Sequence, residues 1–227
     1  FNKKHTFKNS ILTAFGMTKK SDHSAENDPM ISSLINSKAN SICLFGKSWD
    51  FHVDVALGIS KEQNLKNISE SAKHIINSGK EFMFDAEHFF DGYKSNKEYA
   101  LNCIKSAFDQ GARWIILCDT NGGTLPHEIS KIVTDVAKHI PGKNLGIHAH
   151  NDTENAVANS LVAIQAGVRQ VQGTINGLGE RCGNANLMSL IPSLYLKHEF
   201  SNNYKINIKE DNIKHLTQCS RLLDEIL

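Results

Sequence analysis

The sequence predicts an α/β protein, namely an incomplete TIM-type (β/α)8 barrel with about six βα units. Two observations support this fold class. Short apolar segments alternate with amphipathic segments of helical period, and the alternation recurs roughly every 30–40 residues. Polar side chains follow several of the short segments at the point where each would end. The active site of a (β/α)8 barrel is built from residues at such strand ends.

Six short segments have the character of parallel strands buried on both faces, because they are mostly apolar and bounded by polar or glycine residues. The predicted strands are Ile11–Phe15, Ser41–Phe45, Glu81–Asp85, Trp114–Cys118, Leu145–His150 and Gln170–Ile175. An open doubly wound sheet would use the same edge for its site. The barrel is favoured because the chain has no GxGxxG turn and its polar residues follow several successive strands.

Apolar stripes at helical spacing lie between the predicted strands. Asp28-Pro29 resembles an N-cap followed by a first-turn proline, which predicts a helix start. Four later stripes are expected to stop just before a glycine, the residue that most readily adopts the left-handed backbone of a helix end. These glycines are Gly79, Gly111, Gly142 and Gly167. Residues 1–198 are thus predicted to form the partial catalytic barrel, and residues 199–227 a linker and the start of a helical subdomain.

The composition excludes several classes of protein. With a formal net charge of +1, the chain has no basic field that would favour nucleic acid or a membrane surface, so neither is expected as a partner. No apolar run approaches the roughly 18–20 residues of a membrane-spanning helix. The five cysteines are odd in number and lack CxxC spacing, which argues against a disulfide framework or a thiolate zinc site. This cysteine usage fits a reducing cytoplasm, and Cys43, Cys103 and Cys118 are predicted to be small core residues.

The segment Gly146–Asp152 (GIHAHND) is the most informative stretch of the chain. Alternate side chains of a strand point the same way, so His148 and His150 are expected to project from one face at a strand end. Two neutral imidazoles presented together suit a divalent metal ion. Taken alone, an HxH pattern is as compatible with two unrelated histidines on a half-buried strand.

Two acidic residues, Asp85 and Glu87, share a face if the third predicted strand continues past Asp85. A carboxylate at a barrel mouth can act as a base, a metal ligand or an orienting group. A solvated loop acid is the common alternative. Lys47 lies in a GKS segment and is expected to meet an anionic group. A nucleotide P-loop is rejected, because Ser41 stands where its first glycine would fall.

Two glycine-containing loops complete the candidate site. In Cys118–Thr124, the glycine pair predicts a tight turn, Thr120 is a candidate donor to a substrate carboxylate, and Thr124 is expected to cap the next helix. In Gly173–Asn186, Asn184 offers a neutral oxygen ligand for Mg, Mn or Zn.

Other residues of these loops are expected to have structural roles or no assigned role. Arg181 is expected to pair with Glu180 or with charges at the barrel mouth. Cys182 is not expected to be a nucleophile, since no neighbouring histidine or lysine would activate it. The remaining histidines singled out are predicted to be surface or loop residues, namely His88, His127, His139 and His198.

Together these segments resemble the metal-dependent, acyl-CoA-condensing barrel family of 2-isopropylmalate, homocitrate and citramalate synthases. The resemblance covers about Ile11 to Lys197, and its motifs are HAHND (His148–Asp152), GTINGLGERCGNANL (Gly173–Leu187), CDTNGG (Cys118–Gly123) and DAEHFFDGYKSN (Asp85–Asn96). FGKSWDFHV and DAEHFFDGYK are more similar to the citramalate synthase branch.

The resemblance implies a Claisen-type condensation of acetyl-CoA with pyruvate to give citramalate and CoA, a step towards isoleucine. It further implies a divalent metal (Mn, Mg or Zn) and a cytoplasmic homodimer. It assigns roles to five residues: His148 and His150 as metal ligands, Asn184 near or on the metal, Glu87 as the active-site acid and Thr120 as a contact of the keto-acid carboxylate. Glu87 could instead position a metal-bound water or the keto acid, and Asp85 at the barrel mouth is expected to bind substrate.

The chain departs from the family in two respects. It has no DxTLRDG-type motif, so it is expected to lack the first two barrel strands, together with the C-terminal regulatory region. Glu154 also stands where the family often has glycine. The isolated piece is therefore predicted to be inactive and poorly stable, because its barrel edges are open and its ligand set incomplete.

Three other interpretations are compatible with parts of the sequence. One is a 2-isopropylmalate or homocitrate synthase. Another is a carbon–carbon lyase such as 3-hydroxy-3-methylglutaryl-CoA lyase, which is disfavoured because the loop reads GLGERCGN and not GGCP. The last is an inert metal-binding fragment.

Overall fold

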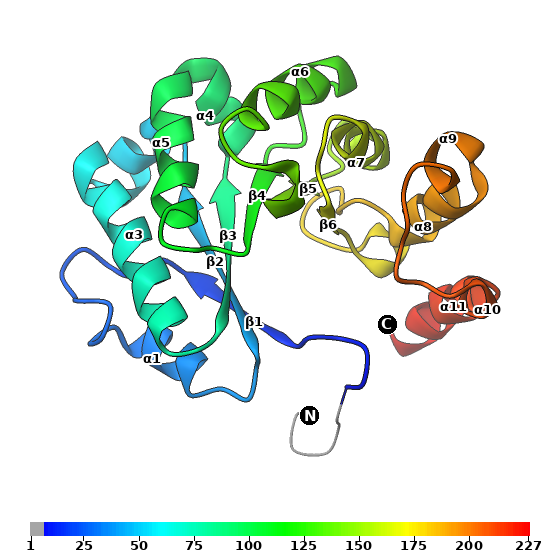
Figure 1. Cartoon of the computed structure of the whole chain (residues 1–227), viewed down its shortest axis with the longest axis horizontal. Coiled ribbons are helices and arrows are strands. Elements are labelled where there is room, and N and C mark those ends of the chain that lie inside the picture. The colour runs from blue at the N-terminus through cyan, green and yellow to red at the C-terminus, as the bar shows by residue number, and fades with distance from the viewer. Residues whose placement is uncertain (1–6) are drawn as a thin grey trace.

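A curved parallel sheet flanked by helices forms the part of the chain that the computed structural model describes, residues 7–227 (Figure 1). Each strand pairs in parallel with the next along the chain, in the order β1-β2-β3-β4-β5-β6. Sequential parallel strands joined by helices are the wall of a (β/α)8 barrel, which agrees with the predicted fold class. The strands are β1 (Thr13–Met17), β2 (Ser41–Lys47), β3 (Glu81–Glu87), β4 (Trp114–Asp119), β5 (Leu145–Ala149) and β6 (Gln170–Gln172).

The larger helices lie along the outside of the curved sheet (Figure 1). In chain order the α-helices are α1 (Pro29–Ile35), α2 (Asp50–His52), α3 (Lys61–Asn77), α4 (Phe89–Ser95), α5 (Lys97–Phe108), α6 (Pro126–Val136), α7 (Ala156–Gln165), α8 (Leu187–Leu196), α9 (His198–Ser201), α10 (Glu210–Ile213) and α11 (Leu216–Ile226). A π-helical turn, η1 (Val53–Leu57), and two 3-10 turns, η2 (Gly142–Asn144) and η3 (Ile175–Gly177), complete the described elements.

The two faces of the sheet have different chemistry. Phe82 and Phe84 of β3, Leu117 of β4 and Ile147 of β5 belong to a buried apolar cluster shared with the helices. The alternate residues face the barrel interior and are more polar, as Asp85 of β3 illustrates. One face of the sheet therefore packs against the helices, and the other face is available for a site.

A hydrogen bond across the interior records the curvature of the sheet. Nε2 of Gln172 on β6 donates to Oδ1 of Asp85 on β3 over 2.9 Å. In a flat sheet these strands, which are three places apart, would be separated by about 14 Å. The sheet must therefore curl so that side chains from β3 and β6 meet inside it.

All six predicted strands have different limits in the structure, and β2, β3 and β4 run one or two residues past their predicted ends. β1 is displaced by two residues from the predicted Ile11–Phe15, because its pairing with β2 runs from Thr13 to Met17. β5 and β6 end earlier than predicted. Beyond them His150 and Thr174 form isolated bridges with Asn184 and Asn186, since the loop before α8 folds back over the strand ends.

The structure confirms the predicted helix start at Asp28-Pro29 and three of the four predicted glycine stops. Asp28 caps α1, and its carboxylate accepts from the backbone N–H groups of Met30 and Ile31 over 3.0 and 3.1 Å. The glycines after α3, α5 and α7 have left-handed backbones as predicted, with φ of 82° at Gly79, 102° at Gly111 and 125° at Gly167.

The predicted stop at Gly142 was wrong. α6 already ends at Val136, and Gly142 begins η2. Residues 137–139 form a turn after α6, and the Ile140 N–H still donates to the Val136 carbonyl over 3.0 Å. Pro141 disfavours helical backbone at Ile140, so the helix cannot continue to Gly142.

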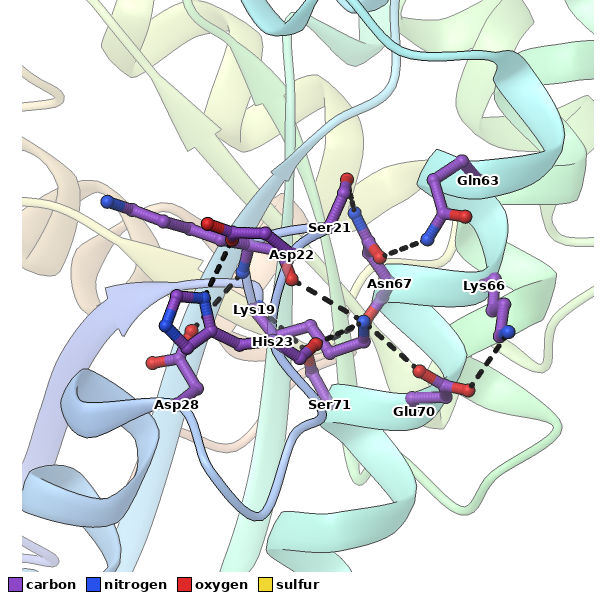
Figure 2. A network of polar contacts seen from close by, with 11 residues as sticks. Lys19, Ser21, Asp22, His23, Asp28, Gln63, Lys66, Asn67, Glu70 and Ser71 are labelled. Carbon is purple, nitrogen blue, oxygen red and sulfur yellow. Dashed lines mark hydrogen bonds and ion pairs between the residues drawn. The ribbon is translucent and has the colours of Figure 1, made fainter.

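A network of polar contacts holds the loop after β1 against α3 (Figure 2). The Lys19 side chain is 3% exposed, and its Nζ lies 3.2 Å from a carboxylate oxygen of Glu70 and donates to the His23 carbonyl over 2.9 Å. The Lys19 N–H donates to Oγ of Ser71 over 2.9 Å. Since a buried ammonium group requires such partners, this loop has a defined position at the carboxyl edge of the sheet.

The cysteines behave as predicted for a reduced chain. All five are free thiols, and Cys43, Cys103 and Cys118 are buried, which confirms them as core residues. Burial raises the pKa of Cys103 to about 12 and that of Cys118 well above its ordinary value.

The C-terminal part of the chain is helical. α9 spans the predicted boundary at residue 198, and residues 202–209 between α9 and α10 form neither helix nor strand. A separate helical subdomain from residue 199 stays a prediction. Among the described residues, the helices are too short or too polar to cross a membrane.

Candidate active site

The two histidines of the HAHND segment converge at the end of β5. His148 belongs to β5 and His150 follows it, and their Nε2 atoms lie 3.3 Å apart. Two nitrogens bound to one zinc ion at 2.0–2.1 Å, with a tetrahedral angle between them, lie roughly 3.3 Å apart. The imidazoles therefore have a spacing that fits two ligands of one ion.

Asn184 lies beside His150 in the fold. It forms an isolated antiparallel bridge with His150, and its Nδ2 donates to the Leu178 carbonyl over 2.9 Å. Its Oδ1 is buried, and no hydrogen-bond partner lies within reach among the described residues. A buried acceptor without a partner is costly, so a cation at this point would remove an unfavourable feature of the fold.

The donor set fits a divalent metal ion. Two imidazoles and an amide oxygen suit zinc or manganese better than magnesium, which prefers oxygen ligands. Within residues 7–227, no cluster of three or more His, Cys, Asp or Glu side chains has metal-binding geometry. Burial, followed by the neighbouring charges of His148 and Arg181, lowers the pKa of His150 and favours the neutral ligand form.

Glu87 pairs with a lysine from the neighbouring strand β2. The third strand does continue past Asp85, and the Lys47 ammonium lies 2.7 Å from a carboxylate oxygen of Glu87. Both side chains are about one-fifth exposed, at 20% and 22%. The anionic group that Lys47 was expected to meet is thus supplied by the chain itself, and Glu87 is held at the carboxyl edge of the sheet.

Asp85 lies one layer deeper than Glu87. It is 5% exposed, and its Oδ1 accepts from the Cys43 thiol over 3.1 Å and from the Gln172 amide over 2.9 Å. Burial raises the pKa of Asp85, against the opposing effect of these hydrogen bonds. The contacts it makes are to protein groups, and its predicted substrate contact stays a prediction.

Thr120 begins the turn after β4. Its Oγ1 accepts from the His88 backbone N–H over 2.8 Å, so the hydroxyl proton is free to donate to a ligand. Asp119 shapes the turn by accepting from Oγ1 of Thr124 over 2.8 Å. Thr124 is therefore not the helix cap that was predicted. The N-cap position belongs to Leu125, whose N–H is bound by Glu128.

His88 lies in the turn after β3, as the prediction of a surface or loop residue allowed, but it is not at the surface. It is 8% exposed and has a left-handed backbone with φ of 57° directly after β3. Its ring packs edge-on against His52 with centroids 4.2 Å apart, and lies 5.9 Å from the Trp49 ring. The aromatic residues of the GKSWDFH segment bury it, and the prediction did not consider that segment as a partner. The other three histidines of that group are exposed, as predicted.

The loop that carries Asn184 is tied to two other strand ends. Arg181 binds Asp152 through two hydrogen bonds of 2.8 and 3.0 Å, and also donates to the Thr120 carbonyl over 2.6 Å. Of the two open alternatives for Arg181, pairing with a barrel-mouth charge is the one adopted. Arg181 thereby joins the loops that follow β4, β5 and β6, each of which provides a predicted site residue or its neighbour.

Gln172 is the site residue that sequence reasoning missed. Its Oε1 lies 2.8 Å from Nδ1 of His148, opposite which it stands in the β5–β6 register. The available signal was its position two residues after Gln170, at the end of a predicted strand. The predicted strand Gln170–Ile175 is longer than β6, so Gln172 was not predicted to lie at a strand end.

Comparison with known proteins gives a matching family model, similar solved structures and related sequences. A family model described as HMGL-like matches residues 8–220. A hydroxymethylglutaryl-CoA lyase from Pseudomonas aeruginosa has a similar solved structure, with a TM-score of 0.76 and 13% identity over 98% of this chain and 71% of that one. At that identity the likeness concerns the fold alone.

Relatives named (R)-citramalate synthase are 40–52% identical to the chain. That of Aquifex aeolicus is 52% identical over 99% of this chain and 42% of its own length. A 2-isopropylmalate synthase from Sulfurisphaera tokodaii is more distant, at 32% identity over 89% of this chain and 50% of its own length. The chain thus spans about two fifths of the length of the citramalate synthases it matches.

Proposed function

The chain belongs to the HMGL-like family of TIM-barrel proteins, and from this premise we propose that the protein is a citramalate synthase-like acyltransferase. It joins the methyl carbon of acetyl-CoA to the keto carbon of pyruvate, and water then cleaves the thioester to release citramalate and CoA. A methyl proton is lost to a base, and the former keto oxygen gains a proton. The preference for pyruvate is supported by the higher identity to citramalate synthases than to 2-isopropylmalate synthases.

The observation that carries the proposal is the convergence of His148 and His150, with Asn184 bridged to His150 through the backbone. Two Nε2 atoms 3.3 Å apart and an unpaired buried Oδ1 support a divalent metal site there. When bound, such a cation would polarise the carbonyl group of a keto acid as a Lewis acid. We assign the first ligand shell to these three residues, with zinc or manganese favoured.

The neighbouring residues have roles that follow from their contacts. Thr120 retains a free hydroxyl proton, so we assign it to the keto-acid carboxylate. Glu87 is assigned an orienting or acid–base role at the mouth, with its charge balanced by Lys47. Arg181 keeps the Asn184 loop closed over the strand ends through Asp152. Acetyl-CoA as cosubstrate, a homodimeric state and a cytoplasmic location complete the proposal.

The test is CoA release measured with a thiol reagent. The full-length protein would be supplied with acetyl-CoA, manganese or magnesium, and one of three keto acids: pyruvate, 2-oxoisovalerate or 2-oxoglutarate. Metal-dependent release with pyruvate alone, lost in His148→Ala, is the expected result. Preference for a larger keto acid would assign the protein to the isopropylmalate or homocitrate branch, and no release with any of them would refute the synthase proposal.

A further inference from the structure

The two histidines of the candidate metal site are supported unequally. Nδ1 of His148 lies 2.8 Å from Oε1 of Gln172. Nδ1 of His150 is buried and has no hydrogen-bond partner among the described residues. An imidazole binds a metal ion through the nitrogen that carries no proton, and a hydrogen bond at the other nitrogen decides which one that is. Of these two histidines, only His148 has a hydrogen-bond partner at Nδ1 that can select its tautomer.

The orientation of the Gln172 amide is fixed from its other side. Oδ1 of Asp85 accepts both the Gln172 Nε2–H, over 2.9 Å, and the Cys43 thiol, over 3.1 Å. Burial and the nearby Asp85 charge raise the pKa of Cys43, so the thiol keeps its proton and remains a donor. With its nitrogen facing Asp85, the amide must turn its oxygen towards His148.

We propose that Gln172 is a positioning residue that holds His148 in the tautomer protonated at Nδ1, with Asp85 orienting the Gln172 amide. Nε2 of His148 is then left with its lone pair, on the side where Nε2 of His150 lies 3.3 Å away. This inference rests on the proposed metal site, because the role given to Gln172 is to orient one of its candidate ligands.

A purely structural role for Gln172 is less well supported by the same strand. Gln170 faces the same side of β6, and its Oε1 is buried without a hydrogen-bond partner among the described residues. A glutamine at this depth is thus tolerated without a complete set of hydrogen bonds. At Gln172 both ends of the amide are bound, one to a carboxylate and one to an imidazole.

The test replaces each glutamine by a side chain of similar length that lacks the amide. Gln172→Met is the test variant and Gln170→Met its matched control on the same strand. The first readout is the 15N shift of the His148 imidazole in the metal-free full-length protein at pH 8, assigned by comparison with His148→Gln. The second is the dissociation constant for Mn²⁺ or Zn²⁺, measured by competition with a chelating dye.

The expected result is one tautomer, protonated at Nδ1, in the wild type and in Gln170→Met. Gln172→Met should show a mixture of tautomers and bind the metal about 10- to 100-fold more weakly. A second design reverses the polarity of the pair. Asp85→Asn combined with Gln172→Glu keeps the total charge, and the new amide donates to a carboxylate that still accepts from Nδ1 of His148.

This double variant should recover most of the affinity that Gln172→Met loses. A Gln172→Met protein with an unchanged tautomer and an affinity within twofold of the wild type would overturn the inference. So would a double variant as weak as Gln172→Met although it folds. A wild-type protein that binds no metal would refute the proposed metal site, whereas the tautomer in the metal-free protein would still decide the role of Gln172.

Discussion

A methyl group at residue 179 should displace Asn184 and leave the barrel wall intact. A Cβ built on Gly179 lies 2.1 Å from Nδ2 and 2.9 Å from Cγ of Asn184, and real Cβ contacts essentially never fall below 3.0 Å. In Gly179→Ala the Asn184 nitrogen must therefore retreat by at least 0.9 Å, the difference between 3.0 and 2.1 Å. The same nitrogen donates to the Leu178 carbonyl over 2.9 Å, so the retreat also disrupts that hydrogen bond.

The two consequences of this displacement differ in size. One lost hydrogen bond near the surface reduces the free energy of unfolding by about 1 kcal/mol. Oδ1 itself lies 3.5 Å from the added carbon, but it belongs to the same rigid amide plane as Nδ2 and Cγ and moves with them. Metal–ligand distances tolerate deviations of only about 0.2 Å, so this movement removes the oxygen of Asn184 as a ligand. We expect metal affinity to fall about 10- to 100-fold, which corresponds to about 1.4–2.7 kcal/mol.

Gly123→Ala is the matched control. A Cβ at Gly123 meets nothing within 4 Å, and this glycine also lies in a loop at the carboxyl edge of the sheet. Metal affinity would be measured by dye competition and stability by urea unfolding of the metal-free proteins. If Gly179→Ala binds metal as tightly as Gly123→Ala and the wild type, then Asn184 is not a ligand and its placement in the site is refuted.

Three further predictions concern the barrel itself. Glu70→Gln should lower the free energy of unfolding by about 1–2 kcal/mol, because it weakens the pairing of the buried Lys19 with a partner that is 40% exposed; urea unfolding beside Lys66→Gln as control would show it, and equal midpoints would contradict it. Hydrogen bonds, first from Lys97, lower the pKa of Asp135, so its charge stabilises the fold above about pH 4 and the contribution is lost as pH falls: Asp135→Asn should unfold at lower urea than the wild type at pH 7, the difference should shrink as the pH is lowered below about 4, and a pH-independent difference would disprove this. Phe84→Ala removes a fully buried ring and should destabilise the protein by about 3–5 kcal/mol in the same assay, whereas a loss below 1 kcal/mol would mean that the core is misassigned.

The general plan of the fold could be predicted because it depends on local patterns. Buried parallel strands are continuous apolar runs, and glycines such as Gly79 stop helices through their own backbone freedom. Strand limits depend instead on the partner strand. β1 extends to Met17 because β2 offers it a partner there, and nothing within residues 11–17 reveals this.

The approach of the two candidate histidine ligands could be predicted for a related reason. His148 and His150 are two residues apart, so the period of a strand is enough to bring them together. Asn184 is distant in sequence and was assigned through the family motif. Its contact with His150 depends on a loop that turns back over β5, which is a tertiary event.

Gln172 and the Lys47–Glu87 pair could not be predicted from local patterns. The first depends on how far the sheet curls, and the second on the β2–β3 register. His88 illustrates the same limit, since its burial results from the rings of Trp49 and His52 on the preceding βα loop. Contacts of this kind are properties of the assembled sheet, and no single segment encodes them.

Closure of the sheet and orientation of the site are linked by one hydrogen bond. The contact of Gln172 with Asp85 joins β6 to β3 across the interior, and it also turns the amide oxygen towards His148. A change that flattens the sheet would separate these two residues and release the His148 tautomer at the same time. Conversely, a ligand that binds only the closed form adds its binding free energy to the stability of the fold. Saturating metal should therefore raise the unfolding midpoint of the wild type more than that of Gln172→Met, because the variant binds the ion more weakly and has lost the strand-to-strand contact. Equal shifts for the two proteins would contradict the proposed link between the curvature of the sheet and the metal site.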